Sequence, residues 1–156
     1  MTAEMSPCGQ YRYTLTRKIN TPVRWVKPAL FIMLNPSTAD AIKDDPTIRR
    51  CISFAERECV THLTIVNLFA LRATDPRVLA DHPDPVGPMN DLRIAEQIEK
   101  HKLGIVIAAW GAHPFAQRRG KEVLDKFGPL MCLGKTKNGS PRHPLYLKKD
   151  SELIDL

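Results

Sequence analysis

The sequence lacks the motifs of the common nucleotide-dependent and hydrolytic enzymes. It contains no G-x-G-x-x-G and no G-x-x-x-x-G-K-[ST], so dinucleotide binding and P-loop phosphate binding have no fingerprint here. G-x-S-x-G is also missing, which excludes the nucleophile elbow of the α/β-hydrolases. The five histidines lack the spacing of metal ligands. We therefore expect a protein without a cofactor or a bound metal.

The cysteines form no recognisable motif, and long hydrophobic runs are missing. The four cysteines, Cys8, Cys51, Cys59 and Cys132, form no C-x-x-C pair, which argues for free thiols over a disulfide framework or a zinc site. No apolar segment approaches bilayer length, and the N-terminus has no signal-peptide core. We expect a cytoplasmic protein that does not enter a membrane.

Length and composition are those of an ordinary globular domain. The 156 residues are 43% hydrophobic and 26% charged, which predicts one domain over residues 1–156. The net charge of +6 favours a polyanionic partner, DNA or a nucleotide, provided that the positive residues gather near a site.

Short apolar runs alternate with helical patterns along most of the chain. Asp45-Pro46 is a strong helix start, because Asp is a preferred N-cap and Pro suits the first helical position. The pattern predicts a three-layer α/β/α sandwich with a mainly parallel central sheet. Its strands are expected at 29–34, 62–66, 105–110 and 130–133, and its helices at 46–58, 89–100 and 114–127.

The N-terminal segment alternates in the manner of a strand. Residues 11–19 place Tyr11, Tyr13, Leu15 and Arg17 on one predicted face, and a turn at 20–22 follows. We expect residues 23–26 to return as a hairpin, with the pair at an edge of the sheet.

Polar loops follow each of the predicted central strands. In open α/β sheets, ligands bind beyond the carboxyl ends of the strands, so these loops should share one rim. Asn35 follows the first central strand, Asn67 the second and Trp110 the third, and His143 lies in the loop after the fourth. This convergence is the main pointer to a site.

Each of these side chains has a structural alternative. Asn35 can hold a water or a carbonyl, but Asn-Pro also opens turns. Asn67 offers the donor and acceptor needed to read a nucleobase edge, or it caps a strand end. His143 can stabilise an oxyanion or act as acid or base, or it packs in a turn fixed by flanking prolines.

The basic residues of these loops also allow two interpretations. They can hold phosphates, or they can be ordinary solvated charge. Together with Ser37, the candidates for phosphate or DNA binding are Arg72, Lys135, Lys137 and Arg142.

At these motifs the sequence resembles known families. LNPSTAD, DPTIRRC, VNLFALRAT, DPVG, AWG and PRHPLYL identify it, over nearly the whole chain, as a member of domain-of-unknown-function family 1643. The order of the motifs is also similar, more distantly, to the uracil-DNA glycosylase superfamily. LNPST matches the water-positioning loop of that superfamily, IVNLFALRA the base-reading strand, AAWG its W-G segment and RHPLYL its H-P-S loop.

The distant resemblance implies a uracil-DNA glycosylase-like fold and roles for individual residues. Asn35 would hold the attacking water, and His143 would stabilise the base that leaves as an anion. Asn67 would read the base edge, with Pro36, Phe69 and Trp110 completing the base-binding set. Three residues depart from the superfamily pattern: Leu34 replaces a small or polar residue, Ser37 stands where Gly or Tyr is usual, and Leu145 replaces the Ser of H-P-S. The scattered cysteines do not match the iron–sulfur pattern of some branches of the superfamily, so we expect no iron–sulfur cluster.

Three functions therefore stay open. The first is hydrolysis of the N-glycosidic bond of a nucleobase in DNA, without a covalent intermediate. The second is a non-catalytic module that binds a nucleotide or nucleic acid, which the departure at Leu145 favours. The third is an enzyme that acts on a free nucleoside or another small N-glycoside.

Overall fold

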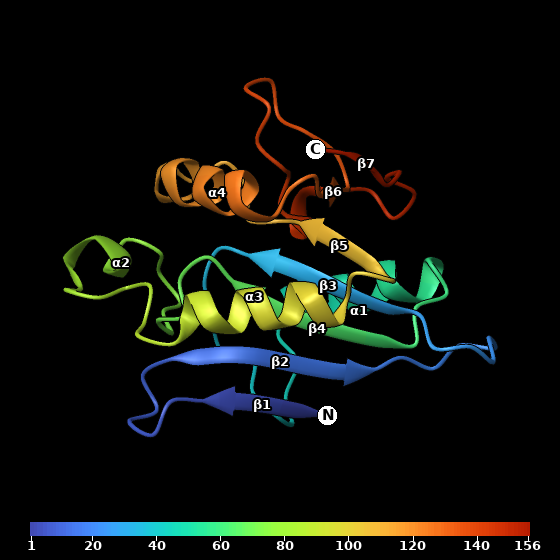
Figure 1. The fold of residues 1–156 in the computed structure, drawn as a ribbon, viewed down its shortest axis with the longest axis horizontal. Coiled ribbons are helices and arrows are strands. Elements are labelled where there is room, and N and C mark those ends of the chain that lie inside the picture. The colour runs from blue at the N-terminus through green and yellow to red at the C-terminus, as the bar shows by residue number, and fades with distance from the viewer.

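A seven-stranded mixed sheet forms the centre of the computed structural model, which describes residues 1–156 (Figure 1). The strand order is β1-β2-β4-β3-β5-β6-β7, and β4, β3, β5 and β6 run parallel to one another, while β1, β2 and β7 pair antiparallel. The strands are β1 Thr2–Met5, β2 Arg12–Lys18, β3 Pro28–Met33, β4 His62–Asn67, β5 Ile105–Ala108, β6 Met131–Cys132 and β7 Ile154–Asp155. The predicted α/β class with a parallel centre is confirmed.

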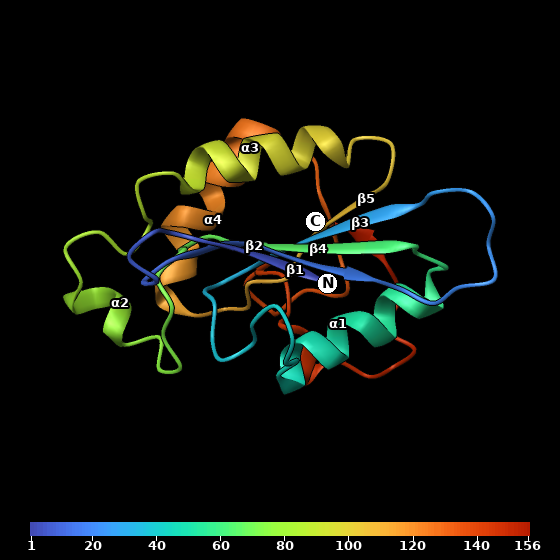
Figure 2. The same cartoon turned by 90° about the horizontal axis from the view of Figure 1, so that it is seen from below.

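Helices cover both faces of this sheet. In Figure 2, α1 lies on one face of the sheet and α3 on the other. Helix α4 packs in the same hydrophobic cluster as α3, so the domain has three layers. The helices are α1 Pro46–Arg57, α2 Val78–Asp81, α3 Asn90–Lys100 and α4 Pro114–Phe127, with a 3₁₀ helix, η1, at Pro144–Tyr146. Helix α1 begins where the sequence predicts, because Asp45 Oδ1 accepts a hydrogen bond from the Ile48 amide at 2.9 Å.

The predicted N-terminal hairpin is wrong. Strand β2 pairs with β1 on one side and with β4 on the other, and residues 23–26 form no strand. Strand β2 therefore lies inside the sheet, and β1 takes the edge. The sequence gives little sign of this, because the residues of β1, TAEM, are too few and too polar to show strand periodicity.

A β-bulge divides the side chains that the sequence placed on one face of β2. In the register of the two strands, Glu4 pairs with Thr14 but Met5 pairs with Arg12, so β2 holds one extra residue at this point. Tyr13 consequently packs on the α3 face of the sheet, whereas Leu15 packs on the α1 face. The bulge also turns the Arg12 side chain towards the α1 face, where Nη1 donates to the Ala39 carbonyl.

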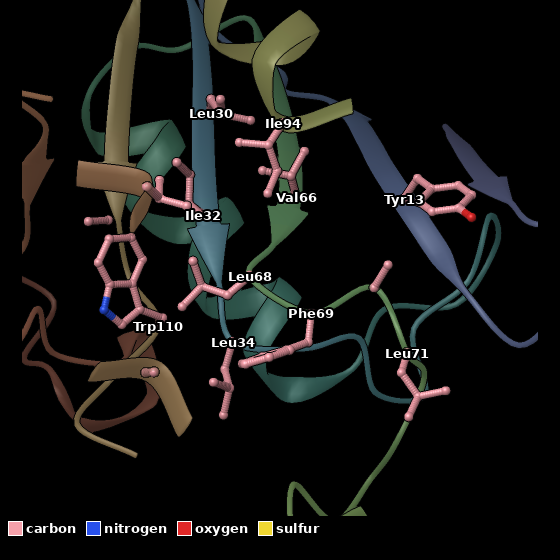
Figure 3. Close-up of a cluster of buried hydrophobic side chains, with 14 of the residues drawn as sticks. Tyr13, Leu30, Ile32, Leu34, Val66, Leu68, Phe69, Leu71, Ile94 and Trp110 are labelled. Carbon is pink, nitrogen blue, oxygen red and sulfur yellow. The ribbon is translucent and has the colours of Figure 1, made fainter. Parts of the chain in front are cut away.

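The sheet separates two hydrophobic clusters. Strand β3 contributes to both, because Leu30 and Ile32 face α3 and α4 while Phe31 faces α1. Figure 3 shows the first cluster, in which Leu30 and Ile32 lie close to Val66 and Ile94. A strand that is apolar on both faces is typical of a parallel sheet covered by helices, and it fixes β3 at the centre.

The remaining sequence predictions concern cysteines and membrane spans. All four cysteines are free thiols; Cys51 and Cys132 are buried, while Cys8 and Cys59 are exposed. No helix combines the length and the apolar character that crossing a bilayer requires.

Candidate functional site

A cavity of about 380 Å³ lies beyond the carboxyl ends of β3, β4 and β5. Its volume falls within the range of about 300–1,000 Å³ that is usual for small-molecule sites. Asn35, Asn67 and His143, which are far apart in the sequence, all line it. Parallel strands deliver their carboxyl ends to one edge of a sheet, which is why these loops meet.

Several segments besides the strand ends complete the cavity wall. The start of β2 contributes Arg12, and the first turn of α1 contributes Asp45 and Thr47. The α4 N-terminus contributes His113, and η1 contributes Tyr146. The cavity therefore contains one arginine, one carboxylate and two histidines among otherwise neutral side chains.

Asn67 presents an unused amide to this cavity. Its side chain is 1% exposed, and its Nδ2 has no hydrogen-bond partner in the protein. Leaving a buried polar group unpaired costs about 1–3 kcal/mol, so such groups are rare. Because Asn67 lines the cavity, its amide lies beside the space that a ligand could occupy.

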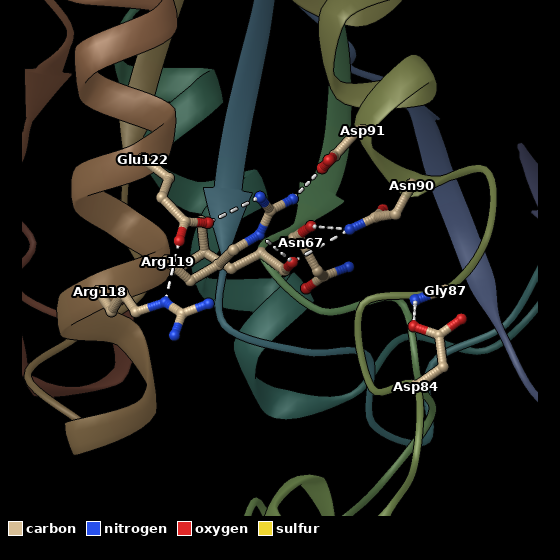
Figure 4. Close-up of polar contacts among 9 residues, drawn as sticks. Asn67, Asp84, Gly87, Asn90, Asp91, Arg118, Arg119 and Glu122 are labelled. Carbon is tan, nitrogen blue, oxygen red and sulfur yellow. Dashed lines mark hydrogen bonds and ion pairs between the residues drawn. The ribbon is translucent and has the colours of Figure 1, made fainter.

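Side chains of α3 and α4 hold the backbone at the end of β4, where Asn67 lies. Asn90 at the start of α3 donates from Nδ2 to the Asn67 carbonyl at 2.9 Å and to the Leu68 carbonyl at 3.1 Å (Figure 4). Arg119 of α4 donates to the same Leu68 carbonyl at 3.2 Å and is itself held by Asp91 and Glu122. These contacts fix the strand end and so position the Asn67 side chain.

Asn35 has a fixed orientation and one free oxygen. Its Nδ2 donates to the Ala73 carbonyl at 2.7 Å and to the Pro36 carbonyl at 3.1 Å, which uses both amide protons. Oδ1 accepts no hydrogen bond from the protein and can therefore only accept from a ligand or a water. In this arrangement Oδ1 can hold a water molecule by accepting a hydrogen bond from one of the protons of the water.

His143 is held as a neutral hydrogen-bond donor. It caps η1, and its Nδ1 accepts from the Leu145 amide at 3.3 Å, so the neutral ring carries its proton on Nε2. Burial lowers the pKa of His143, and the charge of Asp45 opposes that shift in part. At neutral pH the ring can thus donate from Nε2 without carrying a charge.

Lowering the pH from 7.5 to 5.5 is expected to reduce the free energy of unfolding. Burial lowers the pKa of both His143 and His101 in the folded protein, so the unfolded chain binds more protons once the pH falls below about 6.5. Denaturant titrations at the two pH values measure this loss. The variant His143→Asn, which keeps a capping side chain, should show a smaller loss; an equal loss would contradict the assigned shift.

Trp110 forms part of both the cavity wall and the core. Its ring packs directly on Gly120 in the middle of α4, where an added Cβ would lie 2.9 Å from two of its ring atoms. A glycine in a helix interior costs about 1 kcal/mol relative to alanine. Its presence here is explained by the close approach of the indole, which no larger residue would allow.

The variant Gly120→Ala is therefore expected to be less stable than the wild type, by about 1 kcal/mol. The gain in helix propensity is about 1 kcal/mol, whereas overpacking against a buried ring costs about 1–3 kcal/mol. Denaturant unfolding measures the difference. Gln117→Ala, at an exposed position of the same helix, is the control and should change stability little. A more stable Gly120→Ala protein would contradict the packing argument.

Arg12 is the residue of the cavity that sequence reasoning missed. It is 2% exposed, and burial lowers its pKa to about 10, with Asp45 acting in the opposite direction, so it is charged at neutral pH. Its Nε has no acceptor in the protein. No local signal could have found it, because the bulge that turns it to the cavity depends on pairing with β1.

Other lining residues carried weak signals in the sequence. Asp45 was interpreted only as a helix cap, which it is, yet it also lines the cavity. His113 repeats the arrangement of His143: a His-Pro pair in which Nδ1 accepts a backbone amide, here from Phe115 at 3.4 Å. His113 belongs to one of the loops that the sequence predicts at this rim, and it lines the cavity.

Several predicted site residues lie outside this cavity. Ser37 and Trp110 line it, but Arg72 instead joins Ser37 at a neighbouring shallow hollow. Phe69 is buried in the cluster on the α3 face (Figure 3). Pro36 is buried, and its carbonyl accepts a hydrogen bond from Asn35. The three basic residues of the loop after β6 do not reach the cavity wall: Lys135, Lys137 and Arg142.

The basic loop is folded on itself instead. Lys135 and Pro141 form a β-bridge, and Arg142 donates to the Tyr146 carbonyl at 3.1 Å. These three basic side chains are therefore not part of the cavity wall. No group of three or more His, Cys, Asp or Glu side chains is arranged to hold a metal ion.

Fold and site together define a three-layer α/β domain with a cavity at the carboxyl ends of its central parallel strands. The chain belongs to the family described as protein of unknown function (DUF1643), whose model matches residues 12–145. No curated protein and no solved structure matches it.

Proposed function

We propose that the cavity binds a nucleobase and that the protein hydrolyses the N-glycosidic bond that joins this base to its sugar. The observation that carries the proposal is the buried, unpaired amide of Asn67. An amide offers a donor and an acceptor side by side, which is the pattern needed to read the edge of a base. The resemblance of the motif order to the uracil-DNA glycosylase superfamily supports the same role.

The reaction assigns one task to each polar side chain of the wall. Asn35 accepts a hydrogen bond from water through Oδ1 and orients the water oxygen towards the sugar carbon. The carbon–nitrogen bond breaks as the carbon–oxygen bond forms, and the electron pair of the broken bond moves onto the base nitrogen. Asp45 stabilises the positive charge that develops on the sugar and receives the proton released by the water.

His143 stabilises the leaving base. A neutral imidazole that donates from Nε2 lowers the energy of negative charge developing on a base oxygen, without first transferring its proton. The products are the free base and a sugar with a hydroxyl group at the former glycosidic carbon. The scheme needs no oxidant, metal or covalent intermediate.

Base release tests the proposal directly. Wild-type protein is incubated with DNA that contains uracil, hypoxanthine, xanthine or a mispaired thymine, and with the corresponding nucleosides and nucleoside 5′-phosphates. Released base is measured by chromatography, and DNA is also examined by alkaline strand scission. We expect release from at least one substrate, and loss of that release in Asn35→Ala and Asn67→Ala.

Asn20→Ala is the matched control, because Asn20 is exposed and lies outside the cavity. It should release base as fast as the wild type. Equal inactivity of wild type and Asn35→Ala on every substrate would contradict the proposed reaction. Binding that depends on Asn67 without any release would assign the cavity to a binding module instead.

A further inference from the structure

Arg12 is an internal cation without a counter-charge in the protein. Its side chain is 2% exposed, and it takes part in none of the ion pairs of the chain. Nη1 donates to the Ala39 carbonyl, whereas Nε has no acceptor. Burying a charge without pairing it is costly, so a charge that is kept in this way needs an explanation.

Arg17, on the same strand, shows how the protein provides hydrogen-bond partners for a buried arginine. It is also 2% exposed, but its Nε pairs with Asp44 Oδ1 at 2.8 Å, and its two terminal nitrogens donate to the carbonyls of Thr16 and Asp40. All three nitrogens of Arg17 therefore have partners. Arg12 differs from Arg17 because it faces the cavity, where a partner can come from outside the chain.

Among the carboxylates, Asp45 has the largest effect on the pKa of Arg12, but it does not neutralise the charge of the guanidinium. The two side chains form no ion pair, and Asp45 Oδ1 already accepts the Ile48 amide as the cap of α1. Arg72 and Arg17 add positive charge around Arg12, and Asp40 adds a smaller negative contribution. The Arg12 end of the cavity therefore has unpaired positive charge and an unused N–H donor.

We propose that Arg12 is an anion subsite inside the cavity, and that the substrate is a small anionic N-glycoside of the nucleoside monophosphate class. This inference rests on the proposed function, which places a base at Asn67. The planar guanidinium suits the oxygens of a phosphate or carboxylate. An arginine buried this deeply is out of reach of the phosphates of duplex DNA lying on the surface, so the anion must enter with the ligand.

The cavity wall contains a single basic side chain. Arg12 is the only arginine or lysine that lines it. One internal cation matches one anionic group.

Calorimetric binding to the full chain tests the subsite. The probes are the 5′-monophosphates of uridine, cytidine, adenosine, guanosine and inosine, each beside its nucleoside, with ribose 5-phosphate and a uracil-containing single-stranded oligonucleotide. We expect one monophosphate to bind about 10- to 100-fold more tightly than its nucleoside, as a charge-assisted hydrogen bond implies. Arg12→Gln should abolish this difference and leave the nucleoside affinity unchanged.

Two further variants keep the test decisive. Arg24→Gln removes the same charge from an exposed position outside the cavity and should preserve the difference between monophosphate and nucleoside. Arg12→Lys keeps a charge but not the planar fork, and should retain part of the difference even if Arg12→Gln folds poorly. Equal affinity of the wild type for monophosphate and nucleoside would overturn the inference, as would equal effects of Arg12→Gln and Arg24→Gln or tighter binding of the oligonucleotide.

The same measurements separate this inference from the proposed function. Nucleoside binding that depends on Asn67 but gains nothing from a phosphate would leave the base site intact and overturn the anion subsite. Binding of ribose 5-phosphate as tightly as any nucleotide, lost in Arg12→Gln, would support the anion subsite and contradict the base site.

Discussion

Replacement of His143 by alanine is expected to slow base release by about 10²- to 10³-fold, which is the usual cost of removing one donor to a developing negative charge. The structure gives the reason: Nδ1 is bound to the Leu145 amide, so only the Nε2 proton is available to the leaving base. The effect should fall on the rate of the chemical step and little on ground-state binding. Single-turnover measurements with the substrate found in the release assay separate the two.

The control variant for this prediction must keep a side chain that can cap η1. His143→Asn retains a side chain that can cap η1 but removes the ring donor, so it should be as slow as His143→Ala while its unfolding midpoint stays close to that of the wild type. His82→Ala, at a histidine outside the cavity, should leave the rate unchanged. A rate for His143→Ala within about twofold of the wild type would remove His143 from the mechanism.

The largest expected loss of stability comes from Phe31→Ala, at about 3–5 kcal/mol in the free energy of unfolding. Phe31 has no exposed surface, and it lies in register with Ile65 of β4 and Ile107 of β5 in the middle of the sheet. Loss of the ring leaves a void that strands paired on both sides cannot close. Denaturant unfolding at neutral pH measures the change.

Phe115→Ala is the comparison for this measurement. Phe115 lies at the start of α4 and packs only at the margin of the other cluster, so its removal should cost less than half as much. A loss below about 1.5 kcal/mol for Phe31→Ala would show that the neighbouring strands can collapse into the space, contrary to the rigid packing inferred here.

The local features of the fold could be predicted because they depend on neighbouring residues. Asp45 and Pro46 specify the start of α1 through a cap and a fixed backbone angle, and helix α4 has the predicted bounds Pro114–Phe127. The apolar run of β3 identifies a strand buried on both faces. The general rule on strand ends then places Asn35, Asn67 and His143 at one rim, and all three line the cavity.

What the sequence did not reveal depends on contacts between distant segments. The pairing of β1 with β2 replaces the predicted hairpin and creates the bulge that turns Arg12 inward. The fit of Trp110 against Gly120 joins two elements whose packing no local pattern describes. The exclusion of Phe69 from the cavity likewise follows from the face on which it packs.

The amino-acid sequence by itself determined the four central strands, the three long helices and which loops share a rim, because periodicity, caps and chain direction are local properties. Only the tertiary structure decided which polar side chains at that rim keep unused hydrogen-bonding groups. All three side-chain nitrogens of Arg17 find partners, whereas Nε of Arg12 and Nδ2 of Asn67, which both line the cavity, do not. Whether a polar group is paired depends on every segment around it, so the sequence alone cannot show it.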